Sequence, residues 1–234
     1  MQRLLPAPAE NVSIESAYSA PLGSHPDRPW VGLSMVASID GSTVVDGASA
    51  GLSSDNDSGV MLRLRALADV IVVGAGTAAG EGYGPPSKDG QRIGVVTRSG
   101  SVDTSTELFS SGAGFVITTS RTEFEERGVD VIRVGEDEVD LAAALRAIPD
   151  VAPGTTFVQL EGGPSLNGAF AEADLLDELN LTTSPAIVGG DGPRLVAKAG
   201  DLSLRYELQQ MAVDDEAFVF SRWRRRRDGA PVSP

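Results

Sequence analysis

Cysteine is absent from the 234 residues of this chain, and histidine occurs once, at position 25. Without cysteine, disulfide bonds, thiolate metal sites, iron–sulfur clusters and a cysteine nucleophile are all excluded. One histidine cannot form a multi-histidine metal site, so we expect no metal. Basic residues are also few, 19 against 33 acidic ones, which gives a net charge of −14. We therefore expect no nucleic-acid partner, because that binding depends on contacts between basic side chains and phosphate.

Long apolar runs are missing too. No stretch approaches the roughly 20 apolar residues that a membrane-spanning helix needs, and the N-terminus lacks the apolar run of a signal peptide. The sequence thus predicts a soluble, cytoplasmic protein with no membrane partner. Its length fits one large domain or two small ones. Because no repeat or interior linker divides it, we expect an N-terminal arm over residues 1–27, one domain over 28–224 and a flexible tail over 225–234, with the arginines of 222–227 solvated.

Apolar strand-like segments alternate with amphipathic ones through most of the chain. Strands are predicted over residues 31–39, 68–73, 92–97, 114–119, 129–134 and 155–160. Helices are predicted from Ser54, a capping residue, to about 67, over 140–148 with an end at Pro149, and from the turn at 161–166 through about 176. Two alternating segments, 204–211 and 216–223, indicate an antiparallel pair. This order is typical of an α/β fold with a largely parallel central sheet, helices on both faces and a C-terminal antiparallel hairpin.

Two glycine-rich turns each follow a predicted strand. They are residues 74–77 (Gly-Ala-Gly-Thr) and residues 161–166 (Glu-Gly-Gly-Pro-Ser-Leu). Glycine lets the backbone approach a ligand closely, and N–H groups at a helix start bind phosphate. Because ligands of open α/β sheets bind at the carboxyl ends of strands, the two turns predict a nucleotide site. The alternative is that the glycines only make tight turns, since Ala79 stands where the Gly-x-Gly-x-x-Gly fingerprint needs its third glycine.

Several charged residues are candidates for ligand contacts. Arg98 follows a strand and is placed to hold an adenosine 2′-phosphate, which would favour NADPH over NADH. The alternatives are a solvated arginine or the same role for Arg121, one strand later. Arg65 either binds a substrate phosphate or carboxylate bidentately or is an ordinary surface residue. Asp40 and Glu161, each at a strand end, either hydrogen-bond a ligand or cap a turn.

Four blocks of sequence together carry a family resemblance. They are residues 28–31 with 37–41, 62–66 with 68–77, 161–167, and 175–179 with 185–190. In this order they resemble the reductase domain of riboflavin biosynthesis, the pyrimidine deaminase/reductase C-terminal family, which is related in fold to dihydrofolate reductase. The resemblance covers nearly all of the chain from Arg28 to about Trp223.

The resemblance implies a dihydrofolate reductase-like fold, a homodimer and an NADPH-dependent oxidoreductase. The implied substrate is a 5-amino-6-ribosylamino-pyrimidine 5′-phosphate, whose ribose is opened to a ribityl chain by hydride transfer. It places Ser49, Arg65 and Glu161 at the substrate, and it assigns no proton donor. The residues placed at the cofactor, together with Arg98, are Val36, Gly74, Gly76, Thr77, Glu81, Thr97, Gly162, Gly163, Pro164, Ser165, Leu166 and Asn167.

The chain also departs from the family pattern. Glu81 stands where the family has an aspartate, residues 82–86 lack an arginine that helps to hold the 5′-phosphate, and Gly51 replaces a tryptophan. The zinc-binding deaminase half has no counterpart in a chain without cysteine. These departures leave two alternatives open: an NADPH-dependent reductase of dihydrofolate or another pteridine, and a nucleotide-binding regulator without catalytic activity.

Overall fold

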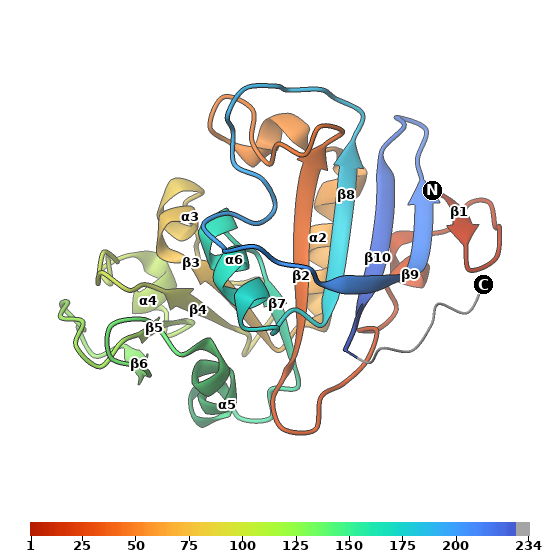
Figure 1. Cartoon of the computed structure of the whole chain (residues 1–234). Coiled ribbons are helices and arrows are strands. Elements are labelled where there is room, and N and C mark those ends of the chain that lie inside the picture. The colour runs from red at the N-terminus through yellow and green to blue at the C-terminus, as the bar shows by residue number, and fades with distance from the viewer. Residues whose placement is uncertain (228–234) are drawn as a thin grey trace.

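The computed structural model describes residues 1–227, which form a ten-stranded sheet in the order β1-β9-β10-β8-β2-β7-β3-β4-β5-β6 (Figure 1). The strands from β8 to β6 in this order run parallel. They are β8 (Glu178–Ser184), β2 (Trp30–Ser38), β7 (Phe157–Leu160), β3 (Val70–Gly74), β4 (Arg92–Val96), β5 (Gly114–Thr118) and β6 (Asp130–Arg133). The antiparallel strands are β1 (Gln2–Leu5), β9 (Arg205–Val213) and β10 (Val219–Arg226). The predicted sheet and terminal hairpin are confirmed.

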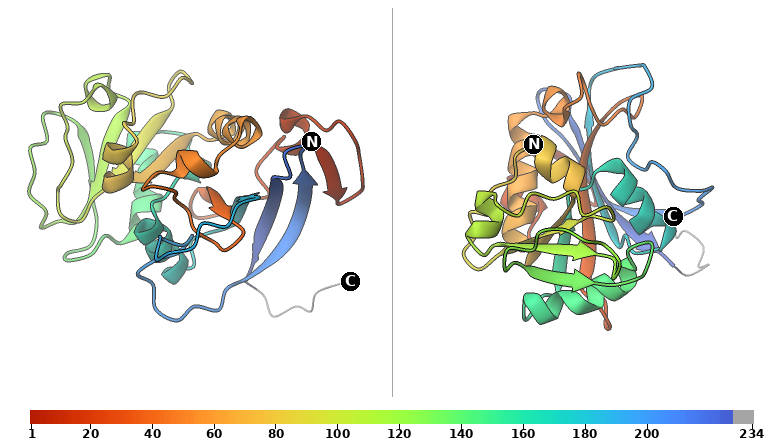
Figure 2. Two further views of the ribbon diagram at one scale, coloured as in Figure 1. Left: turned by 90° about the horizontal axis from the view of Figure 1, so that it is seen from above. Right: turned by 90° about the vertical axis from the view of Figure 1, so that its left-hand side faces the viewer.

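Helices cover both faces of the sheet (Figure 2). They are α1 (Ile14–Ala17), α2 (Asp55–Leu67), α3 (Ala75–Gly80), α4 (Glu107–Ser110), α5 (Leu141–Val151) and α6 (Pro164–Glu172), with a 3₁₀ turn η1 (Ser49–Leu52). Alternation along β3 divides the core: Val70 and Val72 pack with α5 and α6, and Ile71 and Val73 pack with α4 on the opposite face. Among the described residues, no helix is long and apolar enough to cross a membrane.

Side-chain caps explain where two predicted helices begin, but their ends differ from the prediction. Ser54 Oγ accepts the Asp57 N–H at the start of α2, and an Asp140 carboxylate oxygen accepts the Ala143 N–H before α5. Helix α5 includes Pro149 and continues past the predicted stop to Val151; the proline removes one helical N–H donor, and the Ala152 N–H still donates to the Ile148 carbonyl. Helix α6 stops at Glu172, well before residue 176.

The N-terminal segment, predicted as an arm, packs on the sheet edge. Strand β1 pairs with β9, and the Tyr18 side chain is buried beneath α2 in a cluster with Phe220. The Glu178 carboxylate accepts the Leu22 N–H at 2.7 Å and the Trp30 indole N–H at 3.2 Å. Residues 1–27 are therefore tied to the sheet by hydrogen bonds and apolar packing.

Arg224 and Arg227 are exposed, but the prediction of solvated arginines over 222–227 is wrong for Arg222 and Arg225. Arg222 is buried and donates to Glu178 at 2.7 Å, Arg225 donates to Asp174 at 2.6 Å, and Arg227 donates to Asp177 at 2.7 Å. For Arg222 the physical reason is that its partner Glu178 is fully buried, and a buried carboxylate needs a paired cation. Two arginines of the predicted 225–234 tail thus belong to β10, and residues 228–234 lie outside the described residues.

Candidate functional site

The two glycine-rich turns lie against each other at one edge of the sheet. Strands β3 and β7 are parallel neighbours, so their carboxyl ends meet. The Gly74 N–H donates to the Gly162 carbonyl at 2.6 Å, and the Gly163 N–H donates to Thr77 Oγ1 at 3.1 Å. A Cβ atom at position 163 would lie 2.6 Å from that hydroxyl oxygen, so this contact requires glycine.

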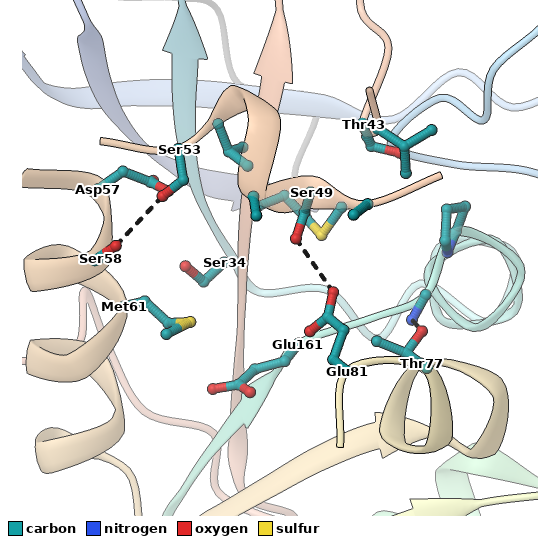
Figure 3. A pocket seen from close by; sticks show the side chains of 18 of the residues that line it. Ser34, Thr43, Ser49, Ser53, Asp57, Ser58, Met61, Thr77, Glu81 and Glu161 are labelled. Atoms are coloured by element: carbon teal, nitrogen blue, oxygen red, sulfur yellow. Dashed lines mark hydrogen bonds between the residues drawn. The ribbon is translucent and has the colours of Figure 1, made fainter. Parts of the chain in front are cut away.

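A cavity of about 660 Å³ opens beside these turns. Its walls come from the end of β2, the segment that leads through η1 into α2, helix α3, and the start of α6 (Figure 3). The polar residues Ser34, Asp57, Ser58 and Tyr83 were missed by the sequence analysis and line it too. The residues predicted from the sequence that line it are Val36, Ser49, Gly76, Thr77, Glu81, Glu161, Gly163 and Pro164.

Glu161 carries the densest set of polar contacts in this cavity. Its Oε1 accepts from Arg65 Nε at 2.7 Å, and its Oε2 accepts from Arg65 Nη2 at 2.6 Å and from the Tyr83 hydroxyl at 2.7 Å. The Arg65 guanidinium also lies 5.3 Å from the centre of the Tyr83 ring. The Glu161 side chain is only 4% exposed, against 27% for Arg65. These contacts fix the plane of the Glu161 carboxylate and hold it toward the cavity.

The Glu161 hydrogen bonds raise the pKa of Arg65 above its usual value. Burial, followed by the charge of Glu161, raises the pKa of Tyr83. Arg65 therefore stays charged and Tyr83 stays a phenol, so both keep donating to Glu161. Arg65 is not among the residues that line the cavity, and its guanidinium is paired with Glu161, which is.

Hydroxyl and carboxylate groups make up the rest of the polar wall. Ser49 Oγ donates to Glu81 Oε1 at 3.1 Å, and Ser53 Oγ donates to Asp57 Oδ2 at 2.6 Å (Figure 3). Asp55 adds a further carboxylate from the first turn of α2. Among the described residues that line the cavity, none is Lys, Arg or His, and none is Asn, Gln or Trp. The sequence signal for this wall is the Ser/Asp-rich run at 53–58, which also contains the helix cap Ser54.

Other residues predicted for the cofactor lie outside the cavity lining. Arg98 pairs with Glu138 at 2.7 Å, with side chains 65% and 75% exposed. Thr97 is buried at the end of β4, and Asn167 is fully buried with its amide donating to the Leu195 carbonyl at 2.9 Å. The Asn167 side chain therefore holds the 186–200 segment in place. The remaining residues of this set are Gly74, Gly162, Ser165 and Leu166.

Asp40, whose role the sequence left open, caps a turn. Its carboxylate accepts from Ser38 Oγ at 2.6 Å and from the N–H groups of Val188 and Gly189 at 3.1 and 2.7 Å. These hydrogen bonds, that of Ser38 above all, hold the pKa of Asp40 below its usual range. Within residues 1–227, no group of three or more His, Cys, Asp or Glu side chains is arranged to hold a metal ion.

Comparisons of this chain with a family model, with curated proteins and with solved structures agree on one family. Residues 29–220 match the family model described as the RibD C-terminal domain. A 2,5-diamino-6-ribosylamino-4(3H)-pyrimidinone 5′-phosphate reductase of Archaeoglobus fulgidus is 28% identical over 71% of this chain and 85% of its own length. The riboflavin biosynthesis protein RibD of Mycobacterium tuberculosis is 31% identical over 69% of this chain and 44% of its own length. A crystal structure of a pyrimidine reductase-like protein from Corynebacterium diphtheriae is 26% identical, with a TM-score of 0.78 over 93% of this chain and 100% of the other.

Proposed function

The chain belongs to the RibD C-terminal domain family, and from this premise we propose that it is an NADPH-dependent reductase of a 5-amino-6-ribosylaminopyrimidine 5′-phosphate. The relative from Archaeoglobus fulgidus is named for the reduction of such a compound. In this reaction the ribose ring opens and its first carbon is reduced, which leaves a ribitylamino chain. The chain is thus an oxidoreductase whose substrate is a small molecule.

One observation carries the proposal: a single cavity is bounded both by the two glycine turns and by the Glu161 cluster. The turns offer backbone groups and free space for a dinucleotide. The cluster offers a fixed carboxylate for the N–H or O–H groups of a substrate. Reductive opening of a sugar needs both partners side by side, because the hydride acceptor must be held next to the cofactor.

The residues at the glycine turns fit a nicotinamide dinucleotide. A Cβ at Gly76 would meet nothing within 4 Å, so there is room for a ligand against α3. Gly163 is the N-cap residue of α6 and has no side chain that could accept a hydrogen bond. The first N–H groups of that helix have no partner inside it. Such a helix start binds phosphate. Val36, at the end of β2, adds an apolar wall next to these groups.

When bound, NADPH would supply the hydride. The chain's own residues bind and orient the substrate. Glu161, held by Arg65 and Tyr83, presents a carboxylate of fixed plane, and Ser49 with Glu81 presents hydroxyl and carboxylate oxygens to the sugar or ring. Arg98 would exchange its exposed partner Glu138 for the 2′-phosphate of the cofactor.

The test follows NADPH oxidation by absorbance in the presence of the ribosylaminopyrimidine phosphate. We expect turnover that depends on this substrate, and a large loss in Glu161→Gln, which keeps the shape of the side chain but removes its charge. Dihydrofolate in the same assay separates the pteridine alternative. Binding of NADPH without turnover of any of these compounds would overturn the proposal and leave the regulator.

A further inference from the structure

We propose that Arg194 is the cation that binds the pyrophosphate of the cofactor at the start of α6. The inference rests on the proposed function and names a residue that lies outside the cavity lining. Arg194 belongs to the segment of residues 185–204, which connects β8 to β9 and passes beside α6 (Figure 1). Its role follows from the charges of the cavity and from the contacts that hold this segment.

The cavity carries negative charge that its own lining does not neutralise. Four carboxylates line it, those of Asp55, Asp57, Glu81 and Glu161, and its described lining contains no Lys, Arg or His. Arg65 pairs with Glu161, but the other three carboxylates form no ion pair within residues 1–227. A pyrophosphate that enters this cavity brings further negative charge, and like charges at close range weaken binding. A cation close to the pyrophosphate would offset this repulsion.

The start of α6 offers only neutral donors to a phosphate. Pro164 has no N–H group, so Ser165 and Leu166 carry the first free N–H groups of this helix. The Thr77 hydroxyl oxygen accepts the Gly163 N–H, and its own hydrogen has no partner in the described part of the chain. These groups can fix the position of a phosphate, but none of them carries a full charge. A charge-assisted hydrogen bond is about twice as strong as a neutral one, so a guanidinium beside them would add the strongest contact.

Hydrogen bonds on both sides of Arg194 place it between the cavity rim and the start of α6. The Pro193 carbonyl accepts from the Thr43 N–H at 2.9 Å and from the Thr43 hydroxyl at 3.0 Å. The Leu195 carbonyl accepts from the side-chain amide of Asn167 at 2.9 Å. Thr43 lines the cavity, and Asn167 lies near the start of α6. The backbone at Arg194 is thus fixed next to both walls of the expected pyrophosphate site.

The Arg194 side chain is exposed, and its charge is not paired inside the described protein. Its guanidinium donates to the Asp40 backbone carbonyl, and within residues 1–227 it forms no ion pair. The Asp40 carboxylate instead accepts from Ser38, Val188 and Gly189. A guanidinium binds a phosphate more strongly than a neutral carbonyl, because the phosphate is charged and accepts two parallel hydrogen bonds. Exchange of the Asp40 carbonyl for the pyrophosphate therefore gains a charge-assisted contact and leaves no acid unpaired.

The test is a calorimetric titration of NADPH and of NADH into the full chain, because both cofactors carry the pyrophosphate and only NADPH carries the 2′-phosphate. Arg194→Gln keeps an amide N–H for the Asp40 carbonyl but removes the charge. We expect this variant to raise the Kd of both cofactors by about tenfold. Arg194→Lys keeps the charge and should recover most of the affinity. Added salt should weaken cofactor binding more in the wild type than in Arg194→Gln, because the lost contact is electrostatic.

The matched control is Lys198→Gln, which removes an exposed cation from the same segment and should leave both Kd values unchanged. Unchanged Kd values in Arg194→Gln, a loss confined to NADPH, or an equal loss in Lys198→Gln would overturn the assignment. A higher KM for the ribosylaminopyrimidine phosphate with unchanged cofactor affinity would also overturn it, since Arg194 would then contact the substrate. In these cases substrate-dependent oxidation of NADPH can persist, and the reductase stands. The expected loss of cofactor affinity without turnover of the substrate would keep the assignment and overturn the reductase.

Discussion

The ion pair between Arg65 and Glu161 gives a prediction whose magnitude follows from the structure. Arg65→Met keeps the length of the side chain but removes both hydrogen bonds to Glu161, of 2.7 and 2.6 Å. Removing one partner of a buried pair costs about 3–5 kcal/mol because the other charge stays buried. The Tyr83 hydroxyl still donates to Glu161, and Arg65 is 27% exposed, so we expect the low end, a loss of about 3 kcal/mol in the free energy of unfolding.

Urea unfolding of Arg65→Met, Glu161→Gln and the double variant measures this coupling. In the double variant no unpaired charge remains, so its loss should be smaller than the sum of the two single losses by at least about 1 kcal/mol. Arg65→Met should also raise KM for the substrate and leave the Kd of NADPH nearly unchanged, because Glu161 loses its orientation while the glycine turns are intact. Strictly additive losses, or an unfolding free energy equal to that of the wild type, would refute the reasoning.

Three further predictions concern the cofactor and the pH dependence. Arg98→Ala should weaken the binding of NADPH by about fivefold and the binding of NADH hardly at all. Arg121→Ala is the matched control. An equal loss of affinity for both cofactors would show that Arg98 does not contact the 2′-phosphate. Gly163→Ala places a Cβ 2.6 Å from Thr77 Oγ1 and should lower Tm and weaken NADPH binding in calorimetry; a normal Kd would contradict this role of the turn. Burial raises the pKa of Tyr206 from 10.0 to about 12, so the unfolded chain releases its proton first and the free energy of unfolding should fall as the pH rises through this interval. Stability that stays constant there, measured by urea unfolding, would contradict the burial of this phenol.

Local sequence signals predicted much of the fold because they act over a few residues. The Ser54 side chain and the acids that follow it predict a helix cap, and in the structure Ser54 Oγ accepts the Asp57 N–H. Short apolar segments predict the parallel strands. The glycines at 74–77 and 161–166 indicate the strand ends that lie at the edge of the cavity. In each case the physical cause lies within one element or its turn.

Contacts between distant parts of the chain could not be predicted in this way. The Tyr83 hydroxyl donates a hydrogen bond to Glu161 although the two residues are 78 positions apart. No residue near Tyr83 in the sequence indicates this partner. Arg222 lies in a basic run that is typical of a solvated end, yet Glu178, 44 positions away, holds it in the interior. Composition describes the average neighbourhood of a residue, whereas burial depends on which strands become neighbours.

A nicotinamide dinucleotide is proposed to bind across the two glycine turns. Hydrogen exchange of the backbone amides, followed by mass spectrometry with and without NADPH, tests this most directly because it reports where the ligand lies. We expect NADPH to slow exchange in residues 74–77 and 162–167 and to leave the β1–β9 edge unaffected. Unchanged exchange in both turns at saturating NADPH would contradict the claim.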